Sequence, residues 1–114
     1  MKYVLMFCET EQWDKAWEAM DQAERDAGFV KVQEWLARHA DKITHHRKLT
    51  DPHTATTVRL DEGEAPIVTD GPFVEGKEVV SGYVEVDVDD LDEALRMAKE
   101  WPACPLVEIR PVLM

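Results

Sequence analysis

Residues 80–88 alternate between apolar and polar side chains, and this alternation limits the folds that the chain can adopt. Valine stands at every second position from 84 to 88, and Tyr83, Glu85 and Asp87 take the positions between. Successive side chains of a β-strand point to opposite faces of its sheet. The pattern therefore predicts a strand that covers a core with one face and presents polar groups on the other.

The rest of the chain divides into segments with strand or helix patterns. The predicted elements, in order, are a strand at 3–8, helical stretches at 11–27 and 29–40 that Gly28 separates or kinks, strands at 43–49, 54–60, 66–69 and 80–88, a helix capped by Asp89 or Asp90 that ends before Pro102, and a strand at 106–112. The stretch at 43–49 is ambiguous but can form a strand. This order predicts a single α+β domain over residues 1–114, with the ferredoxin-like split βαβ arrangement and an antiparallel sheet.

The first predicted strand is apolar on both of its faces. Tyr3, Leu5 and Phe7 share one face, and their neighbours Val4, Met6 and Cys8 share the other. A ferredoxin-like sheet has both helices on one side, so its other side needs a partner if it is apolar. We therefore expect a homodimer in which two sheets close face to face into a barrel.

Composition and charge exclude several classes of protein. The chain has 114 residues, 45% of them hydrophobic, and its formal net charge is −11. That charge repels phosphate backbones, so no nucleic-acid partner is expected. No apolar run is long enough to span a bilayer, and the N-terminus lacks the features of a signal peptide, so a cytoplasmic location is expected. Cys8 and Cys104 have no metal-like spacing and are expected to be free thiols.

The stretch 69–78 contains a turn, an aromatic residue and several charges. Asp70 can accept hydrogen bonds from backbone amides ahead of it, Gly71 can adopt a positive φ, and Pro72 keeps Gly71 out of the helical region. Phe73 follows as an apolar residue that can hold the loop against the body of the protein. The sequence predicts a rigid bend that presents Asp70, Glu75, Lys77 and Glu78 in defined places.

This bend resembles the DGPF motif of the YCII-related proteins, which usually reads DGPFAETKE. The segments 54–59, 81–83, 90–94 and 107–112 and the opening Met1-Lys2-Tyr3 also match the family's pattern. The resemblance implies a small dimeric α/β-barrel protein, similar in architecture to muconolactone isomerases and to heme-degrading or quinol-forming monooxygenases. The chain departs from the pattern at Gly76, where Thr is common. It also departs at residues 43–47, where small residues and glycines are usual.

The same resemblance implies two kinds of function. Some YCII-like relatives act on chlorinated hydroxyquinols and are thought to use a His-Asp pair. Many DGPF-type members are encoded beside extracytoplasmic-function sigma factors. Fold alone does not transfer chemistry, so the residues themselves must decide between these functions.

The candidate catalytic residues are Asp70, His46 and His45. The two histidines are adjacent, so on a strand they point to opposite faces and only one can enter a given pocket. If that histidine meets Asp70 across the sheet, an Asp-oriented imidazole could act as a general base on an acidic phenol or C–H group. The alternatives are a surface histidine pair on an edge strand, and an Asp70 that accepts hydrogen bonds from its own turn.

The candidate substrate-binding residues are Arg59, Phe73, Lys77 and Tyr83. Arg59 could hold a carboxylate through two hydrogen bonds, although a cross-strand ion pair is the alternative. Lys77 stands between acids, and a solvated charge cluster is the alternative for it. No metal site or cofactor is expected, because no H-x-H, H-E-x-x-H, C-x-x-C or Gly-rich phosphate loop is present.

Two functions follow from the sequence. The first is a cofactor-independent enzyme or binder of a small phenolic, quinone or lactone-like molecule, with a pocket between sheet and helices beside the Asp70 bend. The second is a non-catalytic accessory protein whose acidic surface binds a protein partner such as a sigma factor.

Overall fold

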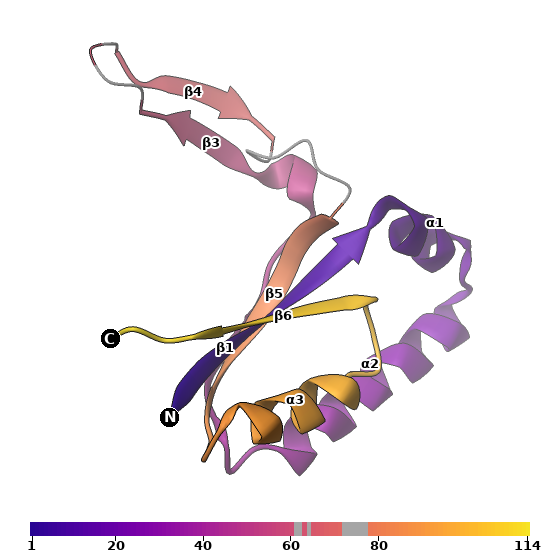
Figure 1. Ribbon diagram of the computed structural model, residues 1–114. Helices are drawn as coiled ribbons and strands as arrows, with labels where there is room; N and C mark the ends of the chain where they lie inside the picture. The colour runs from indigo at the N-terminus through magenta and orange to yellow at the C-terminus, as the bar shows by residue number, and fades with distance from the viewer. Residues whose placement is uncertain (61–62, 64, 72–77) are drawn as a thin grey trace.

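The computed structural model describes residues 1–60, 63, 65–71 and 78–114, and Figure 1 shows the arrangement of the elements. The elements are β1 (Lys2–Thr10), α1 (Glu11–Ala19), α2 (Gln22–Arg38), β2 (Ile43–Lys48), the 3-10 turn η1 (Pro52–Thr54), β3 (Thr56–Arg59), β4 (Ile67–Asp70), β5 (Glu78–Asp87), α3 (Leu91–Lys99) and β6 (Leu106–Pro111). The ambiguous stretch at 43–49 is thus a strand.

The main sheet has the strand order β2-β5-β1-β6, and each neighbouring pair is antiparallel. Strands β1 and β5 lie in the middle of the sheet. After β1 and the first two helices, β2 pairs with β5, and after β5 and α3, β6 pairs with β1. This is the split βαβ order of the ferredoxin-like fold. The predicted α+β class is confirmed.

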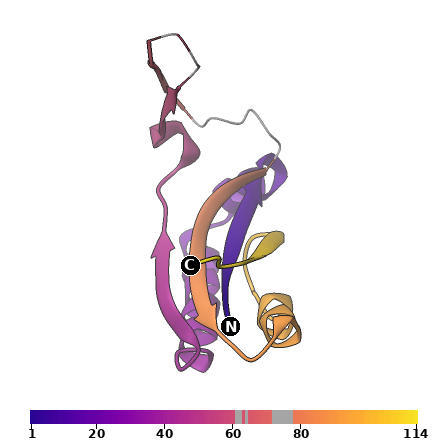
Figure 2. The ribbon, with the colours of Figure 1, turned by 60° about the vertical axis from the view of Figure 1, so that its left-hand side comes forward.

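The predicted alternation along β5 determines which face of the sheet is buried. Val84 and Val86 are fully buried, and Val84 pairs with the equally buried Leu5 of β1. Tyr83 and Glu85 lie on the opposite face and are partly exposed. We call this second face the open face, because the helices do not cover it; Figure 2 shows α2 behind the strands.

Aromatic residues fill the space between the sheet and the helices. Phe7 stacks on Trp101 with ring centroids 3.8 Å apart, and Trp35 meets both rings edge-on. The indole N–H of Trp35 donates a hydrogen bond to the backbone carbonyl of Met97 at 3.0 Å, so the polar atom of this buried side chain is satisfied. The interior beneath the sheet is a packed core.

The break between the first two helices is not at Gly28, and that prediction was wrong. Helix α1 ends at Ala19, and Asp21 begins α2 through a capping box with Glu24, in which each residue bonds the other's backbone amide. A capping box satisfies two amides that a helix start otherwise leaves unpaired, and it outweighs the helix penalty of one glycine. Gly28 lies inside α2 against Trp17. Among the described residues, no helix is long and apolar enough to cross a membrane.

Strands β3 and β4 form the predicted hairpin but do not join the main sheet. They make a separate two-stranded sheet, which we call the arm, and Figure 1 shows it projecting from the end of the main sheet. The radius of gyration is 16.2 Å, whereas a compact chain of this length has about 13 Å. The arm therefore makes the single chain more extended than a globular domain of its size.

Candidate functional site

A β-bulge in β2 decides which histidine faces the open side of the sheet. Ile43 pairs with Val86 on the core side, and His45 pairs with Glu85, so Thr44 is an extra residue between them. In a regular strand, residues 43 and 45 would share a face. The extra residue turns His45 to the open face instead.

His45 meets Tyr83 on the open face. The His45 Nε2 atom lies 3.1 Å from the Tyr83 hydroxyl oxygen, and the two ring centroids are 5.7 Å apart. Tyr83 is the diagonal neighbour of His45, because His45 stands opposite Glu85 two residues along β5. Two proton-exchanging groups are thus in hydrogen-bond contact on a partly exposed surface.

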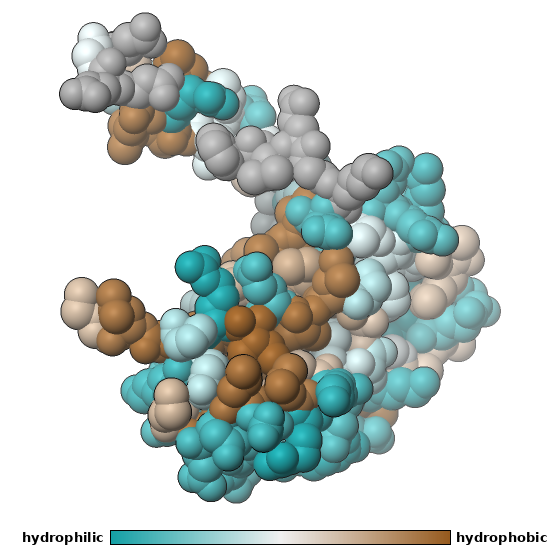
Figure 3. Space-filling view, viewed as in Figure 1, coloured by the Kyte–Doolittle hydropathy of each residue, from teal (hydrophilic) through white to brown (hydrophobic). Residues whose placement is uncertain are grey.

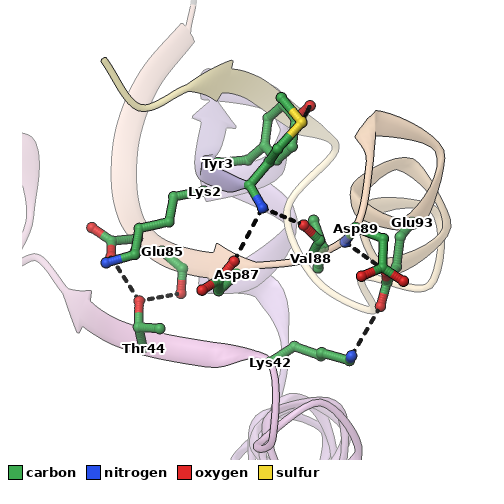
Figure 4. Close-up of polar contacts among 10 residues, drawn as sticks. Lys2, Tyr3, Lys42, Thr44, Glu85, Asp87, Val88, Asp89 and Glu93 are labelled. Carbon is green, nitrogen blue, oxygen red and sulfur yellow. Dashed lines mark hydrogen bonds and ion pairs between the residues drawn. The ribbon is translucent and has the colours of Figure 1, made fainter. Parts of the chain in front are cut away.

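Charged and polar residues surround this pair. Glu85 accepts a hydrogen bond from the hydroxyl of Thr44 at 2.7 Å and lies 3.6 Å from the ammonium of Lys2 (Figure 4). Arg47 stands opposite Tyr83 in the register between β2 and β5. The hydroxyl of the bulge residue thus ties Glu85 to β2, beside His45.

His46 lies on the other face of β2. It pairs with Val84, whose side chain is buried on the core side, but His46 itself is exposed at the sheet edge. No hydrogen bond of its ring is found among the described residues. The expectation that the two histidines point to opposite faces is met, and His45 is the one with a side-chain partner.

The remaining predicted residues lie in or beside the arm. Asp70 ends β4 opposite Thr56, and its carboxylate contacts neither histidine within the described part of the chain. Arg59 lies on β3 opposite Ile67, away from the main sheet. Gly71 has the expected positive φ, 97°. Phe73 and Lys77, with the Glu75 and Gly76 of the same motif, lie outside the described residues. In one chain, the structure brings together His45 and Tyr83 but not Asp70.

A second group of titratable residues, which the sequence did not point to, lies at the end of β1. Burial and a hydrogen bond to Glu9 raise the pKa of Asp14 to about 6. Lys48 lies 3.6 Å from the Glu9 carboxylate and donates to the Ser81 carbonyl at 3.1 Å. Glu9 and Asp14 are five positions apart on different elements, so no periodicity could have revealed the pair.

The two cysteines are free thiols, as expected. Cys104 is buried, and burial raises its pKa, although the indole N–H of Trp101 at 3.4 Å partly offsets this. Burial likewise raises the pKa of Cys8, and the neighbouring Cys104, Glu108 and Glu78 add to this. Neither thiol is activated as a nucleophile, because a nucleophilic cysteine needs a lowered pKa.

A shallow hollow lies elsewhere, between the end of α2 and α3, and it has a volume of about 260 Å³. Several of its charged groups are paired: Glu100 lies 3.1 Å from His39 and 3.2 Å from the neighbouring Arg38, and Lys42 lies 3.5 Å from Glu93 (Figure 4). Bonds from Arg38 and His39 lower the pKa of Glu100, and the Asp89 amide lowers that of Glu93. The lining residues are His39, Asp41, Lys42, Glu93, Arg96, Met97 and Glu100.

The fold and this arrangement define a ferredoxin-like α+β protein with a His-Tyr pair on the open face of its sheet. The chain belongs to the YCII-related domain family, whose pattern matches residues 1–114. It is similar to an uncharacterized protein of Rhizobium meliloti (strain 1021), with 32% identity over 118 residues that cover 100% of this chain and 94% of the relative.

Proposed function

We propose that this protein is a cofactor-independent acid–base catalyst, or binder, for a small acidic molecule of the phenol, quinone or lactone type. The contact of 3.1 Å between His45 and Tyr83 on the open face is the observation that supports it. Imidazole exchanges a proton near neutral pH, and a phenolic hydroxyl can donate to an oxygen that gains negative charge. His45 and Tyr83 are therefore the acid–base residues of the proposal.

The proton transfer follows from these two groups. The neutral imidazole of His45 takes a proton from an O–H or an acidic C–H of the ligand through Nε2, and the electron pair stays on the ligand as an oxyanion. The Tyr83 hydroxyl donates a hydrogen bond to that oxyanion, and the proton returns from His45 to another atom of the ligand. Arg47, opposite Tyr83, adds a positive charge beside the anion.

The ligand would bind on the open face and not beneath the sheet. The space between sheet and helices is filled by Phe7, Trp35 and Trp101, so the pocket that the sequence suggested there has no room in the described core. Val4 and Met6 are the open-face residues of β1 beside Glu85 and Tyr83. A second copy of the chain that covers this face would exclude water from the pair, and the proposal therefore includes the predicted homodimer.

Ligand binding to two variants and a matched control tests the acid–base site. Catechol, hydroxyquinol, benzoquinone and an unsaturated lactone would be screened by thermal shift and measured by calorimetry. We expect His45→Gln and Tyr83→Phe to weaken binding of a hit at least about tenfold, or about 1.4 kcal/mol. His46→Gln, one residue away on the other face, should leave it unchanged. Equal binding by all three variants would place the ligand elsewhere.

A second candidate function is an accessory role in which the protein binds a basic protein partner, such as a sigma factor. The filled interior and the net charge of −11 favour it. Electrostatic association of this kind weakens as salt rises. Purification from the native host at low and high salt separates the two candidates, because this one requires a stoichiometric partner that high salt removes.

A further inference from the structure

The arm has one apolar face that no other described part of the single chain covers. In the register of β3 and β4, Val58 stands opposite Val68, and Leu60 follows on the same side of the hairpin. Their exposed fractions are 53%, 62% and 76%, which are values for side chains in open solvent. Figure 3 shows apolar side chains gathered on the arm, apart from those of the body.

An arm of this kind needs a partner for stability. A two-stranded hairpin alone is at best marginally stable in water, because its apolar side chains have too little to pack against. Each strand of the arm has four residues, and among the strands that the structure describes β3 and β4 pair with each other alone. Burial of the Val58, Leu60 and Val68 side chains would supply the missing stabilisation.

The chain exposes more surface than a compact monomer of its mass. The accessible surface is 8377 Å², whereas a compact monomer of 13.1 kDa exposes about 6,400 Å². The excess is about 2,000 Å², and a stable interface buries about 800 Å² on each partner. One chain therefore exposes more than enough surface for an interface with a second copy.

A complementary apolar strip lies on the open face at the arm end of the main sheet. A register shift between Phe7 and Cys8 interrupts the alternation of β5 and puts Val80 opposite Cys8, on the open face and not on the face of Val84. Leu106 of β6 stands opposite Cys8 on its other side. Val80 and Leu106 are 41% and 39% exposed, although both belong to strands of the main sheet. The strip crosses β5, β1 and β6 at the end of the main sheet where β5 and β6 begin and β1 ends.

We infer that the arm is an intersubunit clasp, whose Val58, Leu60 and Val68 face packs on the Val80, Cys8 and Leu106 strip of a second copy. This inference rests on the homodimer of the proposed function but not on its chemistry. Asp70 shares the apolar face of the arm, two residues after Val68, so docking turns its carboxylate toward the second copy's sheet. The surface that closes over His45 and Tyr83 is then built from two chains.

Two substitutions on neighbouring positions of β4 test the clasp. Val68→Asp puts a charge on the apolar face, and Thr69→Asp puts the same charge on the opposite, exposed face. We expect Val68→Asp to raise the dimer dissociation constant at least about tenfold in sedimentation equilibrium, and Thr69→Asp to leave it within about twofold. The reason is that the clasp would bury the carboxylate at position 68 but leave the one at position 69 in water. A dissociation constant that both variants change equally, or neither changes, overturns the clasp.

A direct contact measurement completes the test. In a mixed dimer with ¹³C-labelled methyl groups in only one copy, isotope-filtered NMR should show cross-peaks between Val68 of one copy and Leu106 of the other. Cross-peaks between the two arms alone would overturn docking on the sheet. A monomer at micromolar concentration would overturn both the dimer and the clasp. Failure of the acid–base proposal would instead leave the cross-peaks intact and abolish the effect of His45→Gln on ligand binding.

Discussion

Asp14 is an acid whose surroundings oppose its ionisation. Its carboxyl group is partly buried at the start of α1 and shares a hydrogen bond with Glu9, while Asp51 adds a further negative charge. Lys48 lies beside Glu9 and offsets only part of this repulsion. The folded protein therefore favours the protonated form of Asp14, and the pair holds one proton near pH 6.

This pair makes stability depend on pH in a defined direction. The pKa of Asp14 rises from 3.8 to about 6 on folding. The stability that the protonated carboxyl group contributes to the folded protein is therefore complete below pH 4 and is lost as the pH rises through 6. We expect Asp14→Asn to stabilise the protein at pH 7.5 by about 1 kcal/mol, since solvent screens part of the interaction. Urea unfolding at pH 5 and pH 7.5 measures the difference.

The control for this prediction is Glu34→Gln, which removes an exposed carboxylate from α2. It changes the net charge equally but should show no gain that grows between pH 5 and pH 7.5. If both variants respond alike, the effect comes from net charge and not from the Glu9–Asp14 pair.

At the scale of single elements, the register of β2 against β5 determines the candidate site. Gly82 of β5 stands opposite Lys48 and beneath the backbone of β2: a Cβ there would lie 2.9 Å from the Arg47 carbonyl oxygen. The bulge at Thr44 then turns His45 toward Tyr83. The close approach at Gly82 and the bulge together hold β2 in place.

Two glycine substitutions should have opposite effects. We expect Gly82→Ala to destabilise the fold by about 1–3 kcal/mol, because backbone atoms of β2 must move away from the new methyl group. Gly28→Ala should stabilise it by up to about 1 kcal/mol, since Gly28 is helical and the nearest atom to its Cβ is a Trp17 ring carbon at 3.5 Å. Chemical denaturation measures both, and hydrogen exchange should show faster amides in β2 for Gly82→Ala alone. A stable Gly82→Ala protein would contradict the close packing of the two strands.

At the scale of the whole molecule, charge acts against compactness. The 24 acidic residues face only 13 lysines and arginines, and the ion pairs found among the described residues lie mostly on exposed side chains. Exposed ion pairs contribute little to the stability of the fold. The excess of 11 negative charges, in contrast, repels itself in the compact folded state. The proposed homodimer would hold twice this charge.

Added salt should therefore stabilise the protein. At 0.15 M ionic strength the screening length is about 8 Å, so repulsion between distant carboxylates falls away while close contacts persist. We expect the free energy of unfolding to rise by about 1 kcal/mol between 10 mM and 300 mM sodium chloride, and the proposed homodimer to associate more tightly. Unfolding and sedimentation in the two buffers measure these effects, and a decrease in both would show that attractive ion pairs dominate.

Much of the fold could be predicted because it depends on local patterns. The alternation along 84–88 determined which face of β5 is buried, and the order of strands and helices determined the ferredoxin-like class. Positive φ at Gly71 also followed from neighbours in the chain. The position of the break between α1 and α2 was not predicted, because the capping box at Asp21 decides where α2 begins and Gly28 is accommodated inside the helix.

The sequence by itself determined the strands and the last helix, the family, and the adjacency that sends His45 and His46 to opposite faces. Only the tertiary structure decided that His45 meets Tyr83, because one extra residue in β2 changes which face each histidine occupies. Only the tertiary structure also placed Asp70 on a separate arm and Asp14 beside Glu9. These contacts join residues from different elements, and their distances depend on strand register and packing, which no local pattern encodes.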